Sequence, residues 1–332
     1  METTNNKVVK INSSLPNEDK PSKAFRSKKE ERRYWILLIT LIVLGGLAAF
    51  GLLVYNNPVP VDSPSFIPVV ERRLDALTAM FIAVICQSLA TVAFQSVTNN
   101  RIITPSLLGF EALYSTIQTS TMFYFGASVF IGFSGTGPFL TQVIIMIVLC
   151  LVLYGWLLSG KYGNLQLMLL VGIIIGTGLR SLSSFMRKLL APSEFDVLQA
   201  RLFGSVNNAD PEYFHIAIPI VIIVALLLLV YSKRLNVMSL GKDIASSLGV
   251  NYRFSVIYVL VLVSILMSVS TALVGPLTFF GFLVATLSYF LILSGAYFIM
   301  YHVFNAQGVV SVIIDMVGGI TFLVIILRRK TL

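Results

Sequence analysis

Two carboxylates lie within or beside long apolar stretches and are the first candidates for chemistry. Glu111 lies near the start of one stretch, and Asp315 lies inside another. Burying a carboxylate in a membrane is costly, so such a group is a functional candidate, and the pair would suit transport coupled to an ion gradient. The helix dipole also favours an acid in the first turns of a helix, so both interpretations of Glu111 stay open. For Asp315 we favour an interior polar contact.

The cysteines and histidines do not form a metal or redox site. Cys86 and Cys150 both lie in apolar runs, where a cysteine packs as a small hydrophobic residue. Two cysteines placed in this way do not make a disulfide or metal framework. The only histidines, His215 and His302, are far apart in the chain, so no metal or other cofactor is expected.

The chain also lacks the sequence motifs of an enzyme. Gly160-Lys161 and Gly241-Lys242 lack the upstream glycine spacing of a phosphate-binding loop. No Gly-x-Ser-x-Gly element occurs that could expose a nucleophile. We therefore predict that the protein is not an enzyme. Any uphill transport would take its energy from an ion gradient or from another subunit.

Composition places these residues in a polytopic membrane protein. The 332 residues are 56% hydrophobic and only 12% charged, with a mean hydropathy of +0.87, whereas soluble domains carry about 25% charged residues. Because a helical span requires about 20 apolar residues, the many apolar runs predict an all-α fold of membrane-spanning helices. The net charge of +9 does not indicate nucleic acid, because Lys and Arg gather at the ends of apolar runs.

Two regions are expected along the chain. Residues 1–33 are polar and basic and are predicted to be a disordered cytoplasmic tail. Residues 34–330 are predicted to be one transmembrane domain in the cytoplasmic membrane, surrounded by membrane lipid. The predicted spans are 34–54, 74–96, 108–130, 139–159, 165–185, 214–231, 254–274 and 309–327, and residues 277–304 form one further apolar run. The intervening segment 186–213 is predicted to form an interfacial helix and loop, without an assigned role.

The polar segment 232–252 between two spans is the most informative stretch. Residues 242–248 suit a short helix with Ile244, Ala245 and Leu248 on its apolar face, stopped by Gly249. A bare turn would be enough to join two spans, so we interpret this helix as a docking surface for a partner. The small residue Ala245 would let that partner approach closely. The alternative is a helix that lies on lipid headgroups, which would favour bulkier apolar anchors.

Breaks in the helical pattern mark a second set of candidates. Asn99, Pro105 and Gly109 interrupt the chain before the third span, and Gly275-Pro276 interrupts it after the seventh. Arg72 and Arg73 open the second span. They either anchor a helix end at the interface or form a basic outer patch for an acidic partner.

Several of these stretches together resemble a known family. TVAFQSVTNNRIITPSLLGFEALY after Arg72-Arg73, MSLGKDIASSLGVN, GPLTFFGFLVATLSY and VVSVIIDMVGGITFLVIILRR occur in order over about residues 70–330. This order resembles the iron-siderophore and cobalamin ABC importer permeases of the FecCD type. The TNNRIITPSLLG stretch resembles the catecholate branch, which includes petrobactin- and anguibactin-type permeases.

The resemblance implies a fold of about nine or ten transmembrane helices. It implies two permease subunits, usually paralogues, together with ATPase subunits that bind the ATP, a substrate-binding lipoprotein and a ferric siderophore as cargo. By the same resemblance, Gly241, Ala245, Leu248 and Gly249 would dock on the ATPase, and Arg72 and Arg73 on the binding protein. The predicted translocation path contains Asn99, Pro105, Gly109, Glu111, Gly275, Pro276 and Gly281.

One departure from the family concerns the C-terminal part. Family members carry a polar loop and a further hydrophobic stretch after the Gly-Pro element, whereas SYFLILSGAYFIM continues without interruption here. Roughly 15–20 residues are missing near 290–295, and 277–304 is long enough for only one crossing. One crossing would leave nine spans and place Arg328-Arg329-Lys330 outside, against the charge rule.

Overall fold

The computed structural model describes residues 28–54, 64, 66–100, 103–132, 135–159, 165–203 and 209–277. These segments are helical, with short turns between them. The chain divides into two compact units, residues 1–43 and 44–332. Of the first unit, the structure describes the start of helix α1 (Lys28–Val54), which continues into the second unit. Residues 28–33 therefore begin a helix although the sequence predicted disorder there, and residues 1–27 lie outside the described part.

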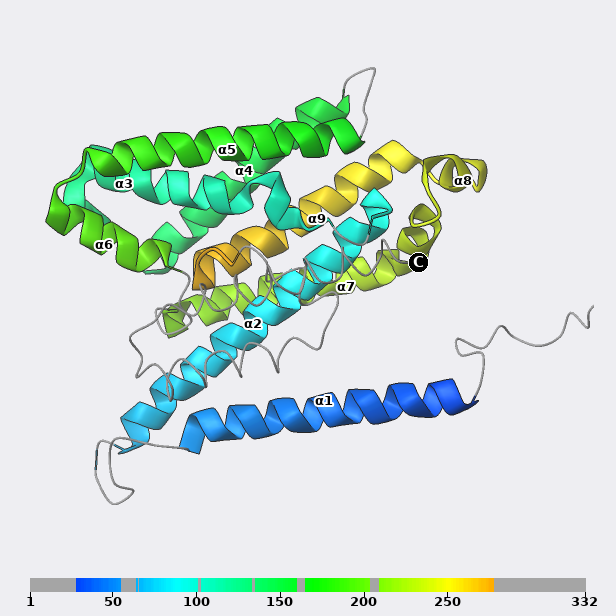
Figure 1. Cartoon of the computed structure of the whole chain (residues 1–332), viewed down its shortest axis with the longest axis horizontal. Coiled ribbons are helices and arrows are strands. Elements are labelled where there is room, and N and C mark those ends of the chain that lie inside the picture. The colour runs from blue at the N-terminus through cyan, green and yellow to red at the C-terminus, as the bar shows by residue number, and fades with distance from the viewer. Residues whose placement is uncertain are drawn as a thin grey trace, which may run out of the picture. The chain divides into compact units, whose positions relative to one another are not determined.

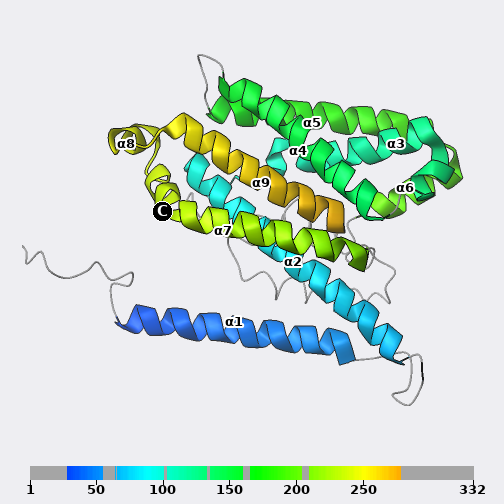
Figure 2. The same cartoon turned by 180° about the vertical axis from the view of Figure 1, so that it is seen from behind.

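The second unit is a bundle of helices (Figure 1). The helices after α1 are α2 (Phe66–Thr98), α3 (Phe110–Gly132), α4 (Thr136–Ser159), α5 (Leu165–Lys188), α6 (Pro192–Leu202), α7 (Phe214–Met238), α8 (Lys242–Ser247) and α9 (Tyr252–Val274). Two short 3-10 helices, η1 (Pro105–Leu108) and η3 (Pro211–Tyr213), precede α3 and α7. Figure 2 shows the same bundle from behind, with α8 beyond the ends of α7 and α9.

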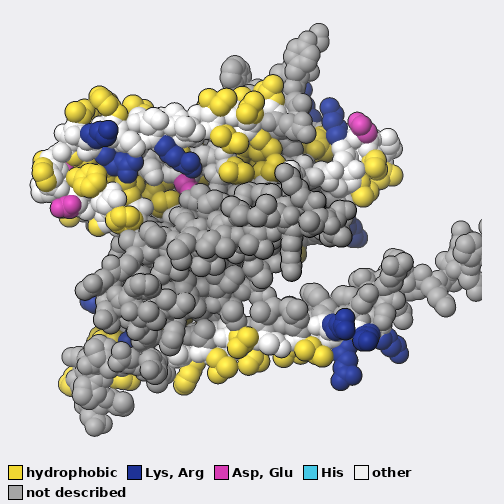
Figure 3. All heavy atoms as spheres, in the orientation of Figure 1, with side chains coloured by type: hydrophobic (Ala, Val, Ile, Leu, Met, Phe, Trp, Pro, Cys, Tyr) yellow, Lys and Arg dark blue, Asp and Glu magenta, His cyan; other side chains and the backbone are white. Residues whose placement is uncertain are grey.

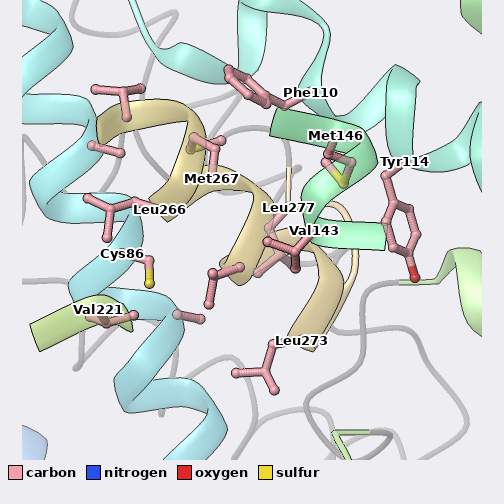
Figure 4. Close-up of a cluster of buried hydrophobic side chains, with 14 of the residues drawn as sticks. Cys86, Phe110, Tyr114, Val143, Met146, Val221, Leu266, Met267, Leu273 and Leu277 are labelled. Atoms are coloured by element: carbon pink, nitrogen blue, oxygen red, sulfur yellow. The ribbon is translucent and has the colours of Figure 1, made fainter. Parts of the chain in front are cut away.

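Helix α9 forms the centre of the bundle. It has its most extensive contact with α2, and it also packs against α4 and α7. Figure 4 shows labelled side chains from α2, α3, α4 and α7 around this helix: Cys86, Tyr114, Val143, Met146 and Val221 lie about Leu266, Met267 and Leu273. Both cysteines are buried and unoxidised, as packing residues.

Small side chains let α2 and α9 approach each other closely. Along α2, Ala76, Ala79, Ala83, Cys86 and Ala90 are all buried and recur every three or four residues. This spacing places them on one stripe of the helix. In a membrane, where apolar side chains gain nothing by leaving lipid, helices associate through such close packing and through interhelical hydrogen bonds. One such bond joins Gln87 Nε2 to Ser270 Oγ at 3.3 Å.

Five of the described helices are long and apolar enough to cross a membrane. They are Phe66–Thr98, Thr136–Tyr154, Leu167–Lys188, Pro211–Met238 and Tyr252–Val274. Helix α3 is interrupted at Gly126, whose φ of 75° and ψ of 174° are not helical. The predicted spans at 277–304 and 309–327 lie outside the described residues.

Two helix ends differ from the sequence-based expectation. The sequence predicted a start at residue 74, but helix α2 begins at Phe66. Pro68 is compatible with this earlier start because it lies in the first turn, where backbone N–H groups have no helical partner. Helix α7 continues past residue 231 to Met238. Its polar last turns are held in place, since Tyr231 Oη lies 2.7 Å from Ser255 Oγ and the Arg234 guanidinium lies over the Tyr231 ring.

Candidate translocation and coupling sites

The short helix α8 lies between two glycines with left-handed backbone. Gly241 has φ of 101° and precedes the helix, and Gly249 has φ of 81° and follows it. Side chains other than glycine are strained at such angles, so these two positions fix both turns. Asn251 then caps α9, its Oδ1 accepting from the Phe254 N–H at 3.2 Å. The segment predicted as the coupling loop, 232–252, therefore consists of the last turns of α7, a turn, α8 and a second turn.

The structure corrects one residue of the docking face that the sequence predicted. Ala245 is fully buried against the rest of the chain and offers no surface to a partner. The exposed apolar side chains of this segment are Leu240, Ile244 and Leu248. The reason is that α8 packs on α7 and α9 through its Ala245 side. The role of Ala245 is therefore to let α8 lie close to the bundle.

The interruption of the chain before α3, the broken segment that contains Asn99, Pro105 and Gly109, starts beside this loop. A side chain at Gly241 would meet Asn99 Nδ2 at 3.7 Å. Asn99 itself has φ of 48°, which ends α2 in a left-handed turn that asparagine tolerates. Nearby, Tyr252 Oη donates to the Val97 carbonyl at 3.0 Å. Asn99 was predicted in the translocation path, and the structure places it next to Gly241.

The remainder of the broken segment is held by α4 and α5. Pro105 begins η1, and Gly109 ends it with φ of 83°. A Cβ on Gly109 would lie 3.2 Å from Gly176 Cα, and a Cβ on Gly172 would lie 3.3 Å from Leu108 Cδ2. Gly172 and Gly176 were not among the predicted site residues, although their Gly-x-x-x-Gly spacing is the signal for close helix packing.

Side chains of α3 and α4 complete this arrangement. The Tyr154 hydroxyl donates to the Leu108 carbonyl, a group that η1 leaves without a helical partner. Glu111, in the first turn of α3, is buried at 5% exposure. Its place at a helix N-terminus agrees with the dipole interpretation. Asp315, the second predicted carboxylate, lies outside the described residues.

The Gly275-Pro276 break lies at the other end of α9. Gly275 ends the helix with φ of 82°, and its N–H donates to the Thr271 carbonyl at 2.9 Å. Gly275 also lines a cavity of about 580 Å³ between α3, α4, α6 and the end of α9. Gly281 lies outside the described residues. The structure thus places the described path residues in three locations: Asn99 lies beside α8, Pro105 and Gly109 lie where η1 meets α5, and Gly275 lies at the opposite end of α9.

Arg72 and Arg73 have different surroundings. Arg73 is half-buried, and its Nη1 donates to the carbonyls of Leu52 and Leu53 at 3.0 and 3.2 Å. These carbonyls end α1, whose last turn has no basic residue of its own. Arg73 therefore satisfies a helix C-terminus. Arg72 is exposed.

Comparison with known proteins decides the family. Residues 35–295 match the FecCD transport family, which is most of the chain. The chain belongs to the FecCD transport family. It is a multi-pass membrane permease of the ABC importer type, an architecture that requires an ATPase and a binding protein, and it is not an enzyme.

Individual relatives agree with this family. The chain is 68% identical to the petrobactin import system permease protein FatC of Bacillus anthracis over 347 aligned positions, covering 99% of this chain and 98% of that protein. It is 37% identical to the petrobactin import system permease protein YclO of Bacillus subtilis, over 78% of this chain and 88% of that protein. It is 24% identical to the petrobactin import system permease protein FatD of Bacillus anthracis, over 82% and 78%.

A solved structure shares the fold of this FecCD permease. An inward-facing metal-chelate type ABC transporter superposes with a TM-score of 0.72 at 19% identity, covering 90% of this chain and 99% of that chain. The all-helical polytopic fold predicted from the sequence is confirmed.

The alignment with FatC also bears on chain length. Its 347 positions exceed the 332 residues of this chain by 15, so FatC has residues where this chain has none. The family match ends at residue 295. The longer alignment agrees with the prediction that this chain lacks residues that its relatives carry. The place of the shortening near 290–295 stays a prediction, because it lies outside the described residues.

Proposed function

We propose that this FecCD permease carries a ferric siderophore of the petrobactin type across the cytoplasmic membrane. The observation that supports this cargo is the 68% identity to a petrobactin import permease along nearly the whole chain. The separate ATPase subunit would bind and hydrolyse the ATP, and a substrate-binding lipoprotein would deliver the cargo.

Coupling to the ATPase would use the exposed side of α8. Leu240, Ile244 and Leu248 form an apolar surface that a partner can cover, while buried Ala245 transmits its movement to α7 and α9. Because Asn99 lies beside Gly241, movement of this loop would also reach the end of α2 and the broken segment. Glycines at 241 and 249 provide hinges at both ends.

A second permease subunit would complete the transporter. We propose a paralogue as that subunit, since both FatC and FatD of Bacillus anthracis bear the name of petrobactin import permeases and are similar to this chain. Arg72 would contact the binding protein, because an exposed guanidinium attracts acidic side chains.

Uptake of iron-55 ferric petrobactin tests the cargo. Cells that lack this permease should regain uptake when the wild-type gene is supplied, and the uptake should persist with an uncoupler while ATP is held constant. Uptake of a different ferric siderophore with none of petrobactin would contradict the cargo. Loss of uptake with the uncoupler alone would contradict ATP-driven transport.

Co-purification of the ATPase tests the coupling surface. Leu248→Asp should remove the ATPase from the purified complex, because Leu248 is exposed and a new carboxylate cannot be buried in an apolar interface. Ser193→Asp on α6, also exposed, is the matched control and should retain the ATPase. Equal recovery from both variants would exclude α8 as the docking helix.

A further inference from the structure

The cavity of about 580 Å³ has a size typical of small-molecule sites, which span about 300–1,000 Å³. Residues of α3, α4, α6 and the last turn of α9 line it. Figure 1 shows α6 and this end of α9 at the end of the bundle opposite α8. At this end Figure 3 shows basic and acidic side chains among hydrophobic ones. Of the predicted site residues that the structure describes, Gly275 lines the cavity.

Polar side chains and aromatic rings line the inner wall of the cavity. Gln118 Nε2 donates to Gln142 Oε1 at 2.8 Å, and both amides line the cavity. The Arg201 guanidinium lies 4.7 Å from the centre of the buried Phe130 ring. Tyr114 Oη donates to the Arg201 carbonyl at 3.4 Å, which fixes α6 against α3.

The cavity is lined by one basic and one acidic side chain that do not form an ion pair with each other. Arg201 and Asp210 both line it. Neither forms an ion pair with another residue in the part of the chain that the structure describes, so their charged atoms are more than 4.0 Å apart. Asp210 Oδ1 instead accepts from the Glu212 N–H at 3.1 Å. A bound molecule with one positive and one negative group would satisfy both charges.

The open side of the cavity is apolar. Phe125 is 64% exposed, Val129 46% and Ile145 39%, and all three line the cavity. They belong to α3 and α4, and α4 is one of the helices long and apolar enough to cross a membrane. A ligand that enters here has to carry an apolar part past these side chains. A hydrated iron chelate would lose its hydration on this route, so it fits the opening poorly.

We propose that this cavity binds the headgroup of a zwitterionic phospholipid. The phosphate lies on the Arg201 guanidinium, whose planar fork matches phosphate oxygens. The ammonium lies toward Asp210, and an acyl chain leaves between Phe125 and Ile145. The bound lipid holds α6 against α3 and α4 at the end of the bundle.

Native mass spectrometry of the full-length protein tests the lipid site. The detergent-purified protein is incubated with equal amounts of phosphatidylethanolamine and phosphatidylglycerol, and retained lipid is measured. The wild type should retain phosphatidylethanolamine preferentially. Arg201→Gln should reduce retention about tenfold, since a charge-assisted contact is lost, and Arg201→Lys should reduce it less. Asp210→Asn, which keeps an acceptor for the Glu212 N–H, should remove the preference between the two lipids.

Controls separate this site from general effects. Arg180→Gln removes an exposed arginine of α5 that does not line the cavity and should leave retention unchanged. Soluble phosphoethanolamine should not displace the lipid, because it lacks the acyl chain. Equal retention by Arg201→Gln and Arg180→Gln would overturn the proposal. Displacement of the lipid by ferric petrobactin would assign the cavity to cargo and would also overturn it.

Discussion

At the scale of single residues, the adjacent Arg72 and Arg73 have separable roles. Arg73→Gln removes hydrogen bonds to the last carbonyls of α1 and should lower the free energy of unfolding by about 1–2 kcal/mol. Arg72→Gln should leave stability unchanged, because its side chain is exposed, and should weaken capture by the binding protein. Thermal unfolding and a pull-down with the purified binding protein measure the two effects. If Arg72→Gln destabilises as much as Arg73→Gln, this division of roles is wrong.

At the scale of elements, the contact between η1 and α5 depends on the absence of a side chain. In Gly176→Ala the new Cβ would lie 3.3 Å from Gly109 Cα, a backbone atom that cannot rotate away. We expect a loss of about 1–3 kcal/mol in stability and reduced uptake, because η1 must shift. Gly178→Ala on the same helix is the control, since its Cβ would meet nothing within 4 Å. Thermal unfolding in detergent compares the variants, and equal midpoints would show that the close approach is unimportant.

At the scale of the whole molecule, the two ends of the bundle should face opposite sides of the membrane. Lys233, Arg234, Lys242 and Arg253 around α8 place that helix in the cytoplasm by the positive-inside rule, so α6, at the opposite end of the bundle, is expected outside. Ser193→Cys on α6 should therefore react with a membrane-impermeant maleimide in intact cells, and Ser246→Cys on α8 only after permeabilisation. Both serines are exposed, and the native Cys86 and Cys150 are buried, which keeps background labelling low. Labelling of Ser246→Cys in intact cells would reverse the orientation.

The sequence by itself determined the class of protein, because a bilayer imposes length and apolarity on every span. It also located α8, since a bare turn would be enough to join two spans, whereas a polar stretch that ends in a helix-stopping glycine indicates a separate short helix. The family followed from motifs such as MSLGKDIASSLGVN and their order.

Only the tertiary structure decided which side of a short segment is buried. Periodicity groups Ile244, Ala245 and Leu248 together, but α8 packs through Ala245 and leaves the larger side chains exposed. Likewise, nothing in the local pattern of Arg73 reveals that the carbonyls ending α1 lie within reach. The contact of Gly109 with Gly176 and the cavity beside Arg201 join residues distant in the chain. Such contacts depend on how whole helices pack, which local sequence does not encode.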